Sequence, residues 1–381
     1  MSETTIIQNA RVVLADKVIE RGYVAFYAGR IAEIGEGRAP ERGINAEGDL
    51  LLPGLVELHT DHLEAHVEPR PKVQWDPVSA VVSYDAQIAT SGITTVLDSL
   101  RVWREEGAES ADGQAALLSS AIDRARAAGL LRVDHYLHLR CEVPMPNVVI
   151  DTAGLIGRKD VRLLSLMDHT PGQRQFQDPQ KLREYYRGKS GMNDAELDGM
   201  FARRVELSEQ YAADNYKGLV ELAQKHGTPI ASHDDTTPAH VEQAIHDRVA
   251  IAEFPTNVPS ADGLHSNGIK VMMGAPNLVR GGSHSGNVAT AELARAGLLD
   301  LMSSDYVPSS LLLAALMLPK QAPNYDLPAA IRTVSKTPAD AVGLSDRGEI
   351  ATGKRADAIR VHVTPEGAAV RSVWSAGRRV A

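Results

Sequence analysis

Histidine and carboxylate side chains recur at the ends of short apolar runs in this 381-residue sequence, and these residue types bind divalent metal ions. The pair His59 and Asp61 stands at the end of the apolar run at residues 55–59. Side chains two residues apart on a strand point to the same side, so both can reach one ion. Four more candidates stand at or just after the ends of other runs: Glu142, His169, His233 and Asp305.

These candidates offer imidazole nitrogen and carboxylate oxygen, which suit zinc, manganese, iron or cobalt. The set is large enough for two ions, and we expect two divalent metals with zinc as the first candidate. Cys141 is the single cysteine, so a thiolate cluster and an intrachain disulfide are both excluded. We interpret Cys141 as a small apolar side chain packed within a strand.

Each candidate also has an ordinary structural interpretation. The sequence contains 13 histidines, and His226, His246 and His265 are best interpreted as structural or surface residues. Glu142 stands two residues after Arg140 and could simply pair with it, while Asp305 could cap the following helix. Their shared position at the ends of apolar runs favours metal binding for both.

The apolar runs indicate the elements that position these residues. Eight runs end in polar residues: 55–59, 94–99, 136–142, 163–169, 229–233, 250–254, 270–274 and 301–305. Helix-forming segments lie between them, notably at residues 113–128, 194–226 and 285–296. This alternation predicts an α/β protein with a (β/α)₈ TIM barrel, in which the carboxyl ends of the strands meet on one face.

The two ends of the chain differ from the middle. Strand-like runs at 5–14, 18–27 and 29–34 are matched by runs at 358–363 and 370–374. We therefore predict a barrel at residues 51–344, flanked by β-rich segments at 1–50 and 345–381. The interval from His169 to Pro229 is too long for one crossover and predicts an inserted segment over the site.

Composition narrows the class of function. The formal net charge of −9 opposes binding to nucleic acid or anionic membranes, and small-molecule chemistry becomes the leading hypothesis. No stretch approaches the roughly 18 apolar residues of a membrane span, and the first residues do not resemble a signal peptide. We expect a cytoplasmic protein.

Three segments resemble signatures of the amidohydrolase superfamily: residues 53–61 (PGLVELHTD), 91–98 (SGITTVLD) and 353–357 (GKRAD). The resemblance spans the whole chain and implies that both β-rich ends fold together into one small β-sandwich. Asp61 stands where the superfamily usually has a second histidine, and Glu142 where many members have a carboxylated lysine. His169 and His233 end the fourth and fifth runs, whereas the superfamily usually uses the fifth and sixth strands.

A narrower resemblance is to the diphosphatase branch of the carbon–phosphorus lyase pathway, which acts in phosphonate utilisation. It is carried by residues 57–61, 69–73, 138–142 (HLRCE), 165–176 (SLMDHTPGQRQF), 231–235 (ASHDD), 273–287 (MGAPNLVRGGSHSGN) and 303–306. The resemblance implies metal-dependent hydrolysis of α-D-ribose 1-methylphosphonate 5-triphosphate to the 5-phosphate and pyrophosphate. It implies Glu142 as the carboxylate between two ions and Asp305 as a ligand that takes the proton from the attacking water.

Such an anionic substrate needs local positive charge and hydrogen-bond donors. The candidates for substrate binding are Arg140, Arg174, Arg280, His284, Arg70, Lys72 and Asp234. Arg280 and His284 stand in a glycine-rich loop after the seventh run, although such loops are also ordinary turns.

Two alternatives stay open at the level of sequence. A carbon-centred amidohydrolase, such as a cyclic amidase or deaminase, would use the same barrel but would seldom need several arginines beside the metals. A non-catalytic scaffold would have lost its ions, and all six candidate ligands are present here. A homodimer is compatible with the resemblance, because related barrels are often dimers.

Overall fold

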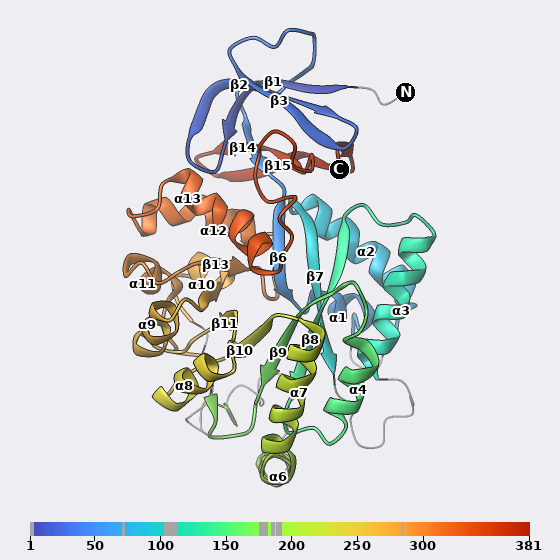
Figure 1. Ribbon diagram of the computed structural model, residues 1–381, viewed down its shortest axis with the longest axis vertical. Coiled ribbons are helices and arrows are strands. Elements are labelled where there is room, and N and C mark those ends of the chain that lie inside the picture. Colours follow the sequence, from blue (N-terminus) through green and yellow to red (C-terminus); the bar gives the residue numbers. More distant parts are fainter. Residues whose placement is uncertain are drawn as a thin grey trace.

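A parallel barrel and a smaller mixed sheet make up the protein (Figure 1). The computed structural model describes residues 4–70, 73–102, 113–174, 182–183, 187, 193–283 and 285–381. The small sheet adjoins one end of the barrel, and both chain termini lie beside it (Figure 1). Among the described residues, no helix is long and apolar enough to cross a membrane.

The barrel contains eight parallel strands in sequence order. They are β6 (Leu55–Thr60), β7 (Ile93–Val102), β8 (Asp134–Glu142), β9 (Val161–Met167), β10 (Ile230–His233), β11 (Ile251–Glu253), β12 (Lys270–Gly274) and β13 (Leu301–Ser303). A parallel bridge between Thr60 and Asp305 joins the first strand to the segment after the last. Each of the eight apolar runs is therefore a strand, and the predicted TIM barrel is confirmed.

Buried Glu57 strengthens the closure of the barrel. Its carboxylate accepts hydrogen bonds from the backbone amides of His59 at 2.7 Å and Ser304 at 2.6 Å, so that it links β6 to the residue after β13. Apolar side chains from seven of the eight strands form one buried cluster, among them Leu58, Leu163 and Met272. A filled interior leaves only the rim of the strands available for a functional site.

Helices pack around the barrel (Figure 1). They are α1 (His62–Val67), α2 (Pro77–Thr90), α3 (Gln114–Ala127), α4 (Val148–Leu155), α6 (Asp194–Leu207), α7 (Ala213–His226), α8 (Pro238–His246), α9 (Val258–Ser266), α10 (Ala275–Arg280), α11 (Thr290–Arg295), α12 (Ser310–Gln321), α13 (Leu327–Arg332) and α14 (Lys336–Ala341). A π-helical turn, η2 (Ser208–Ala212), joins α6 to α7. The predicted segment 194–226 is thus helical throughout.

Local sequence explains where several of these helices begin. Asp76, Thr237, Asn257 and Asp326 each accept a hydrogen bond from the backbone amide three residues later, and a proline occupies one of the first two helical positions. Proline suits the start of a helix because the missing amide hydrogen would have had no partner there. The predicted helix at 285–296 is shorter than expected, since α11 begins only after the glycine-rich loop.

The small sheet combines strands from both ends of the chain. Its strands are β1 (Thr5–Val13), β2 (Val18–Tyr27), β3 (Arg30–Glu36), β4 (Ile44–Asn45), β5 (Leu50–Pro53), β14 (Ala358–Thr364), β15 (Gly367–Ser375) and β16 (Arg378–Arg379). The order is β16-β15-β14-β5-β1-β2-β3, and β4 pairs with β1.

The sheet folds over its own apolar core. The rings of Phe26 on β2 and Trp374 on β15 lie 6.3 Å apart edge to face, although three strands separate β2 from β15 in the sheet. The two ends of the chain therefore enclose a shared core as the predicted β-sandwich would. The predicted domain limits stay a prediction. The strand β5, at residues 50–53, spans the predicted limit at residue 51 and belongs to the small sheet.

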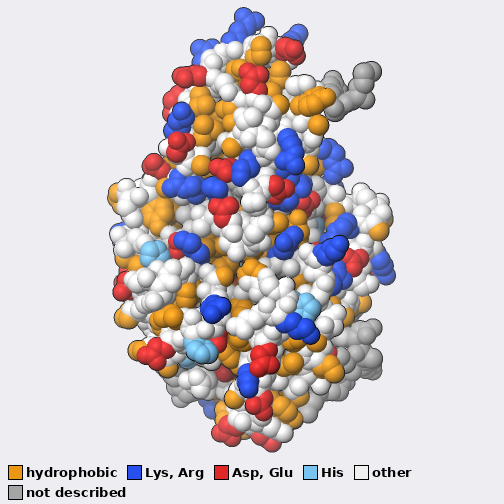
Figure 2. Space-filling model, viewed as in Figure 1, with side chains coloured by type: hydrophobic (Ala, Val, Ile, Leu, Met, Phe, Trp, Pro, Cys, Tyr) orange, Lys and Arg blue, Asp and Glu red, His pale blue; other side chains and the backbone are white. Residues whose placement is uncertain are grey.

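A single residue separates the last N-terminal strand of the small sheet from the first strand of the barrel. Gly54 lies between β5 and β6, and its backbone amide donates to the carbonyl of Asp357 at 3.0 Å. A Cβ atom at this position would lie 2.1 Å from the Thr94 hydroxyl oxygen, so only glycine fits. Charged side chains of both signs are intermixed around this boundary on the face shown in Figure 2.

Candidate active site

A cavity of about 890 Å³ opens at the carboxyl ends of the barrel strands. All six predicted metal ligands line it: His59, Asp61, Glu142, His169, His233 and Asp305. They come from β6, β8, β10 and the segments that follow β6, β9 and β13. The strand numbering is also confirmed, because His169 follows the fourth strand of the barrel and His233 ends the fifth.

Three imidazoles form the centre of the site. His59 and His233 stack with ring centroids 5.6 Å apart, and His169 meets His233 edge to face at the same distance. One donor atom each from His169, His233 and Asp234 lies within 4.8 Å of the others. This group provides two nitrogen donors and one oxygen donor, a combination that binds zinc and related ions.

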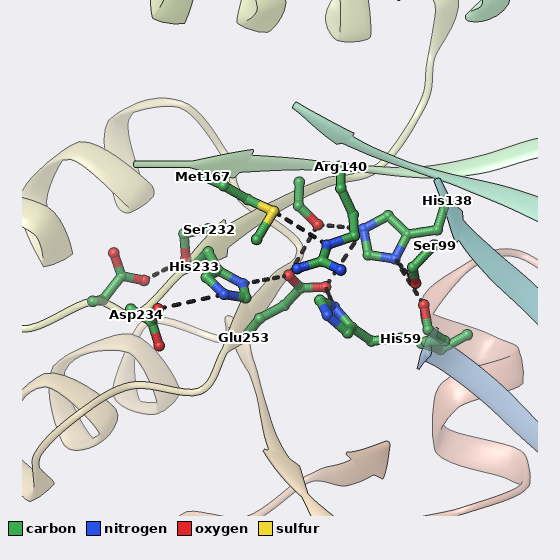
Figure 3. A network of polar contacts seen from close by, with 12 residues as sticks. His59, Ser99, His138, Arg140, Met167, Ser232, His233, Asp234 and Glu253 are labelled. Atoms are coloured by element: carbon green, nitrogen blue, oxygen red, sulfur yellow. Dashed lines mark hydrogen bonds and ion pairs between the residues drawn. The ribbon is translucent and has the colours of Figure 1, made fainter. Parts of the chain in front are cut away.

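Sequence reasoning missed the residue that supports two of these rings. Glu253, at the end of β11, is fully buried. Its carboxylate lies 3.0 Å from Nδ1 of His59 and 2.9 Å from Nδ1 of His233 (Figure 3). Burial would raise the pKa of Glu253, but the imidazoles of His59 and His138 hold it well below its usual value. A signal was available, because Glu253 stands near the end of the sixth apolar run.

Glu142 contacts His169. The Glu142 carboxylate accepts a hydrogen bond from the His169 backbone amide at 2.8 Å and lies 2.6 Å from the His169 ring nitrogen Nδ1. Burial works against the charged form, yet the interaction with His169 lowers the pKa of Glu142 and raises that of His169. Glu142 is therefore ionised at neutral pH and has oxygen atoms at the rim of the cavity.

Asp61 lies among arginines. Its carboxylate is 3.2 Å from Arg140 and 3.7 Å from Arg101. Burial would raise the pKa of Asp61, but these guanidinium groups lower it. In this arrangement Asp61 pairs with cations, while its partner in the sequence motif, His59, contacts Glu253.

Asp305 has the opposite electrostatic environment. Burial, together with the negative charge of Asp61, raises its pKa to about 6. A carboxyl group with a pKa just below neutrality is ionised at pH 7 and can still accept and release a proton, as a general base must. Its position is fixed, because its backbone amide donates to the carbonyl of His59 at 3.1 Å.

The backbone is strained at three strand ends around the cavity. Asp234, Phe254 and Asp305 have φ angles of 55°, 57° and 53°, in the left-handed region that favours glycine. The amide of Asp234 donates to the Glu253 carbonyl, and that of Phe254 donates to the Met272 carbonyl, each on the next strand. These bonds hold a costly conformation that orients side chains into the cavity.

The donor atoms fit the divalent metals expected from the sequence. Imidazole and carboxylate groups line one buried cavity, and the carboxylates are close enough for the charge of Asp61 to raise the pKa of Asp305. A divalent cation among such groups would relieve their mutual repulsion. The cation would be held by His169, His233 and Asp234, with Glu142, His59, Asp61 and Asp305 in reach around the same cavity.

Several arginines surround the metal-capable groups. Those lining the cavity are Arg101, Arg140, Arg203, Arg204 and Arg280. Sequence reasoning named Arg140 and Arg280 but missed Arg101, on β7, and the pair Arg203 and Arg204 on α6. Because α6 belongs to the interval between His169 and Pro229, this part of the predicted insertion forms a wall of the site.

The remaining substrate-binding candidates lie in different places. Asp234 lines the cavity. Arg174 binds the His233 carbonyl at 2.7 Å and Asp235 at 3.0 Å, and it is not among the described residues that line the cavity. Arg70 is exposed and forms a backbone bridge with Val73. Lys72 and His284 lie outside the described residues.

Cys141 and the other histidines behave as expected. Cys141 is buried, and burial raises the pKa of its thiol to about 12, which removes it from nucleophilic chemistry. His226 and His246 are the last residues of α7 and α8, and His265 lies on α9. All three are outside the set of described residues that line the cavity.

Comparison with known proteins agrees with this geometry. The sequence profile of the Amidohydrolase family matches residues 50–380, which include the barrel and the C-terminal strands of the small sheet. The chain belongs to the amidohydrolase family.

A curated relative matches over nearly the full length. The chain is 42% identical over 379 residues to the α-D-ribose 1-methylphosphonate 5-triphosphate diphosphatase of Escherichia coli (strain K12), covering 98% of this chain and 100% of the relative.

Solved structures share the fold at low identity. The N-isopropylammelide isopropylaminohydrolase of Burkholderia multivorans ATCC 17616 has a TM-score of 0.65 at 16% identity, with 99% of this chain and 97% of that chain covered. A β-aspartyl dipeptidase of Fervidobacterium islandicum AW-1 has a TM-score of 0.61 at 17% identity, with 99% and 97% covered. At these identities the likeness concerns the fold alone.

Proposed function

We propose that this chain hydrolyses α-D-ribose 1-methylphosphonate 5-triphosphate to α-D-ribose 1-methylphosphonate 5-phosphate and pyrophosphate in phosphonate catabolism. The observation that carries the proposal is one cavity that combines a cluster of imidazoles and carboxylates with five arginines. The first group suits divalent metals, and the second suits the phosphate groups of a triphosphate. The relative that is 42% identical is named for this substrate.

The reaction adds one water across the phosphoanhydride linkage that joins the first and second phosphorus atoms of the triphosphate. The water oxygen forms a bond to one phosphorus, the bond from that phosphorus to the bridging oxygen breaks, and the bridging oxygen leaves with the other phosphorus. A divalent ion in the site would polarise phosphate oxygens and acidify the attacking water. Asp305 accepts the proton of that water, for which its pKa of about 6 is suited. Arg280 on α10 and Arg204 on α6, which both line the cavity, bind phosphate oxygens and hold the chain of phosphates in line.

The finer metal assignment is also a proposal. We propose two ions, with zinc as the first candidate and manganese, iron or cobalt as alternatives. Glu142 would lie between the ions, and the other ligands would be His59, Asp61, His169, His233 and Asp305. Glu142 is ionised and rim-facing, and His169 and His233 already have donor atoms close together, which supports the proposal.

The two alternatives are less well supported. A cyclic amidase or deaminase acts on a substrate that carries fewer negative charges than a triphosphate, and five arginines in one cavity exceed that need. A non-catalytic scaffold that has lost its ions would gain nothing from the strained strand ends that orient carboxylates into the cavity, although their conformations cost free energy. A cytoplasmic location and a homodimer stay predictions.

The test is pyrophosphate release from the ribose triphosphate by protein reconstituted with Zn²⁺ or Mn²⁺. A chelated sample and a hydantoin or dihydroorotate substrate are the controls. We expect chelator-sensitive release of one pyrophosphate per substrate and no hydrolysis of the cyclic amides. Hydrolysis of a cyclic amide without pyrophosphate release would instead support the carbon-centred alternative.

A further inference from the structure

Glu253 is the meeting point of three histidines from three strands. Its Oε1 atom lies 3.0 Å from Nδ1 of His59 and 3.6 Å from Nε2 of His138, and its Oε2 atom lies 2.9 Å from Nδ1 of His233. Figure 3 shows the carboxylate between these rings. The hydroxyl of Ser165 donates to Oε2 at 2.9 Å and also bonds Nε2 of His138. One carboxylate therefore connects β6, β8, β9 and β10.

Glu253 is placed behind the site and has no access to substrate. It is fully buried and is not among the described residues that line the cavity. His59 and His233 do line the cavity, and the Nδ1 atom of each ring lies beside Glu253. For His233, the second ring nitrogen, Nε2, lies 3.4 Å from the carboxylate of Asp234 in the cavity wall.

An ionised carboxylate has no hydrogen to donate, so a ring nitrogen that binds it must carry the hydrogen. His233 Nδ1 meets this condition at hydrogen-bond distance. His59 Nδ1 is at a similar distance but is not aligned as a hydrogen bond, and both it and Glu253 Oε1 are buried without another hydrogen-bond partner among the described residues. Each atom is thus the natural partner of the other.

We propose that Glu253 is a positioning residue that keeps His59 and His233 protonated at Nδ1, so that both present the unprotonated Nε2 to a divalent metal in the cavity. The inference rests on the metal site of the proposed function. An imidazole binds a metal only through a nitrogen without hydrogen, and the partner of the other nitrogen decides which one that is. A single buried carboxylate then sets the coordinating edge of two rings.

The wild-type protein tests the proposal directly through the ¹⁵N spectra of its imidazoles. The spectra distinguish hydrogen on Nδ1 from hydrogen on Nε2, and His59→Gln and His233→Gln assign the two rings. We expect Nδ1–H on both rings in metal-free protein and after loading with Zn²⁺. Hydrogen on Nε2 of either ring would overturn the proposal. So would loss of the His59 Nδ1–H on zinc loading, because His59 Nδ1 and Glu253 would then be direct ligands.

The variant Glu253→Gln gives a second test, because glutamine has nearly the same shape as glutamate but carries no charge. A glutamine amide has one accepting and one donating end, so it can satisfy only one of the two Nδ1–H groups. The other ring must change its protonated nitrogen or turn away from the cavity. We expect zinc affinity, measured by competition with a chromophoric chelator, to fall about 10- to 100-fold.

The matched control is Glu349→Gln, which removes a carboxylate that pairs with Lys336 and Lys354 away from the cavity. We expect its zinc affinity to equal that of the wild type. A zinc affinity of Glu253→Gln within twofold of the wild type would overturn the proposal. If Glu253→Gln does not fold, the wild-type spectra decide alone.

The two levels of proposal fail differently. A wild-type protein that binds zinc but releases no pyrophosphate from the ribose triphosphate contradicts the proposed function. The imidazole spectra then still test the role of Glu253. A wild-type protein that releases pyrophosphate, with unchanged zinc affinity in Glu253→Gln, contradicts only the role of Glu253.

Discussion

Asp305 is the side chain whose replacement most directly tests the chemistry. In Asp305→Asn the group keeps its size but has lost the ability to accept a proton near neutral pH, so we expect turnover to fall by about 10²- to 10⁴-fold. The fold should persist, because the Asp305 contact that links the strand ends is made by the backbone amide. Pyrophosphate release and thermal melting of the same sample measure both properties.

The exposed variant Asp262→Asn, on α9, is the control and should retain full activity. Turnover of Asp305→Asn equal to that of the wild type would remove Asp305 from the role of general base.

The sequence could bring together the candidate residues that stand at or just after the end of an apolar run. His59, Glu142, His169, His233 and Asp305 all reached the same cavity because parallel strands in a barrel end on one face. Glu253 obeys the same rule but was missed, since it stands one residue before the end of the run at 250–254 and has no other metal-binding residue type beside it. Contacts such as that between Asp61 and Arg140 depend on side-chain directions across strands, which spacing in one segment cannot specify.

At the scale of elements, α6 carries positive charge into the site. Arg203 and Arg204 line the cavity from this helix. Burial would raise the pKa of Glu142, but His169 lowers it, and the charge of Arg204 lowers it further. Sequence analysis predicted an insertion here but not its cations, because a run of charges on a helix is usually a solvated face. Only the packing of α6 against the cavity distinguishes the two cases.

We therefore expect Arg204→Gln to weaken substrate binding. Loss of one charge-assisted hydrogen bond to phosphate costs about 1.5 to 3 kcal/mol, so KM for the ribose triphosphate should rise about 10-fold or more. The effect on kcat should be smaller. Lys217→Gln, on the exposed face of α7, is the matched control and should leave both constants unchanged. An unchanged KM in Arg204→Gln would show that α6 only covers the site.

A second element-scale prediction concerns the contact between α2 and β8. Asp85 on α2 accepts hydrogen bonds from the backbone amides of Arg132 and Val133 and lies 3.3 Å from Nε2 of His135. Nδ1 of His135 lies 2.9 Å from Asp98. Burial would lower the pKa of His135, but these two carboxylates, Asp98 first, raise it to about 9.

The sign of the pH dependence follows from this shift. A histidine whose pKa is about 6.5 in the unfolded chain and about 9 in the folded protein stabilises the fold fully below pH 6.5. That contribution decreases as the pH rises toward 9 and is absent above it. Urea unfolding at pH 6, 7.5 and 9 should show a loss of a few kcal/mol across this interval. His135→Gln should flatten the dependence, and an equal slope in both proteins would contradict the assignment.

At the scale of the whole molecule, the barrel and the small sheet are joined by a charged contact near the start of β8. The Asp134 carboxylate is 2.7 Å from Arg347 and 2.5 Å from Arg355. Arg347 also donates a hydrogen bond to the hydroxyl of Thr95 in the barrel. Arg355 also pairs with the carboxylate of Asp357, whose backbone carbonyl accepts a hydrogen bond from the amide of Gly54. Asp134 thus connects the first residue of a barrel strand to the segment that leads into the C-terminal strands.

The last prediction is that Asp134→Asn loosens this joint without altering the site. The substitution takes one carboxylate partner from each of two mostly buried guanidinium groups, so we expect a loss of about 1 to 3 kcal/mol in the free energy of unfolding. Asp340→Asn, which breaks the exposed pair with Lys336, should cost less than about 1 kcal/mol. Because the cavity lies at the opposite ends of the strands, zinc affinity and pyrophosphate release below the melting temperature should match the wild type. Urea unfolding that shows equal stability for the two variants would mean that the small sheet is held to the barrel by the chain connections and apolar contacts alone.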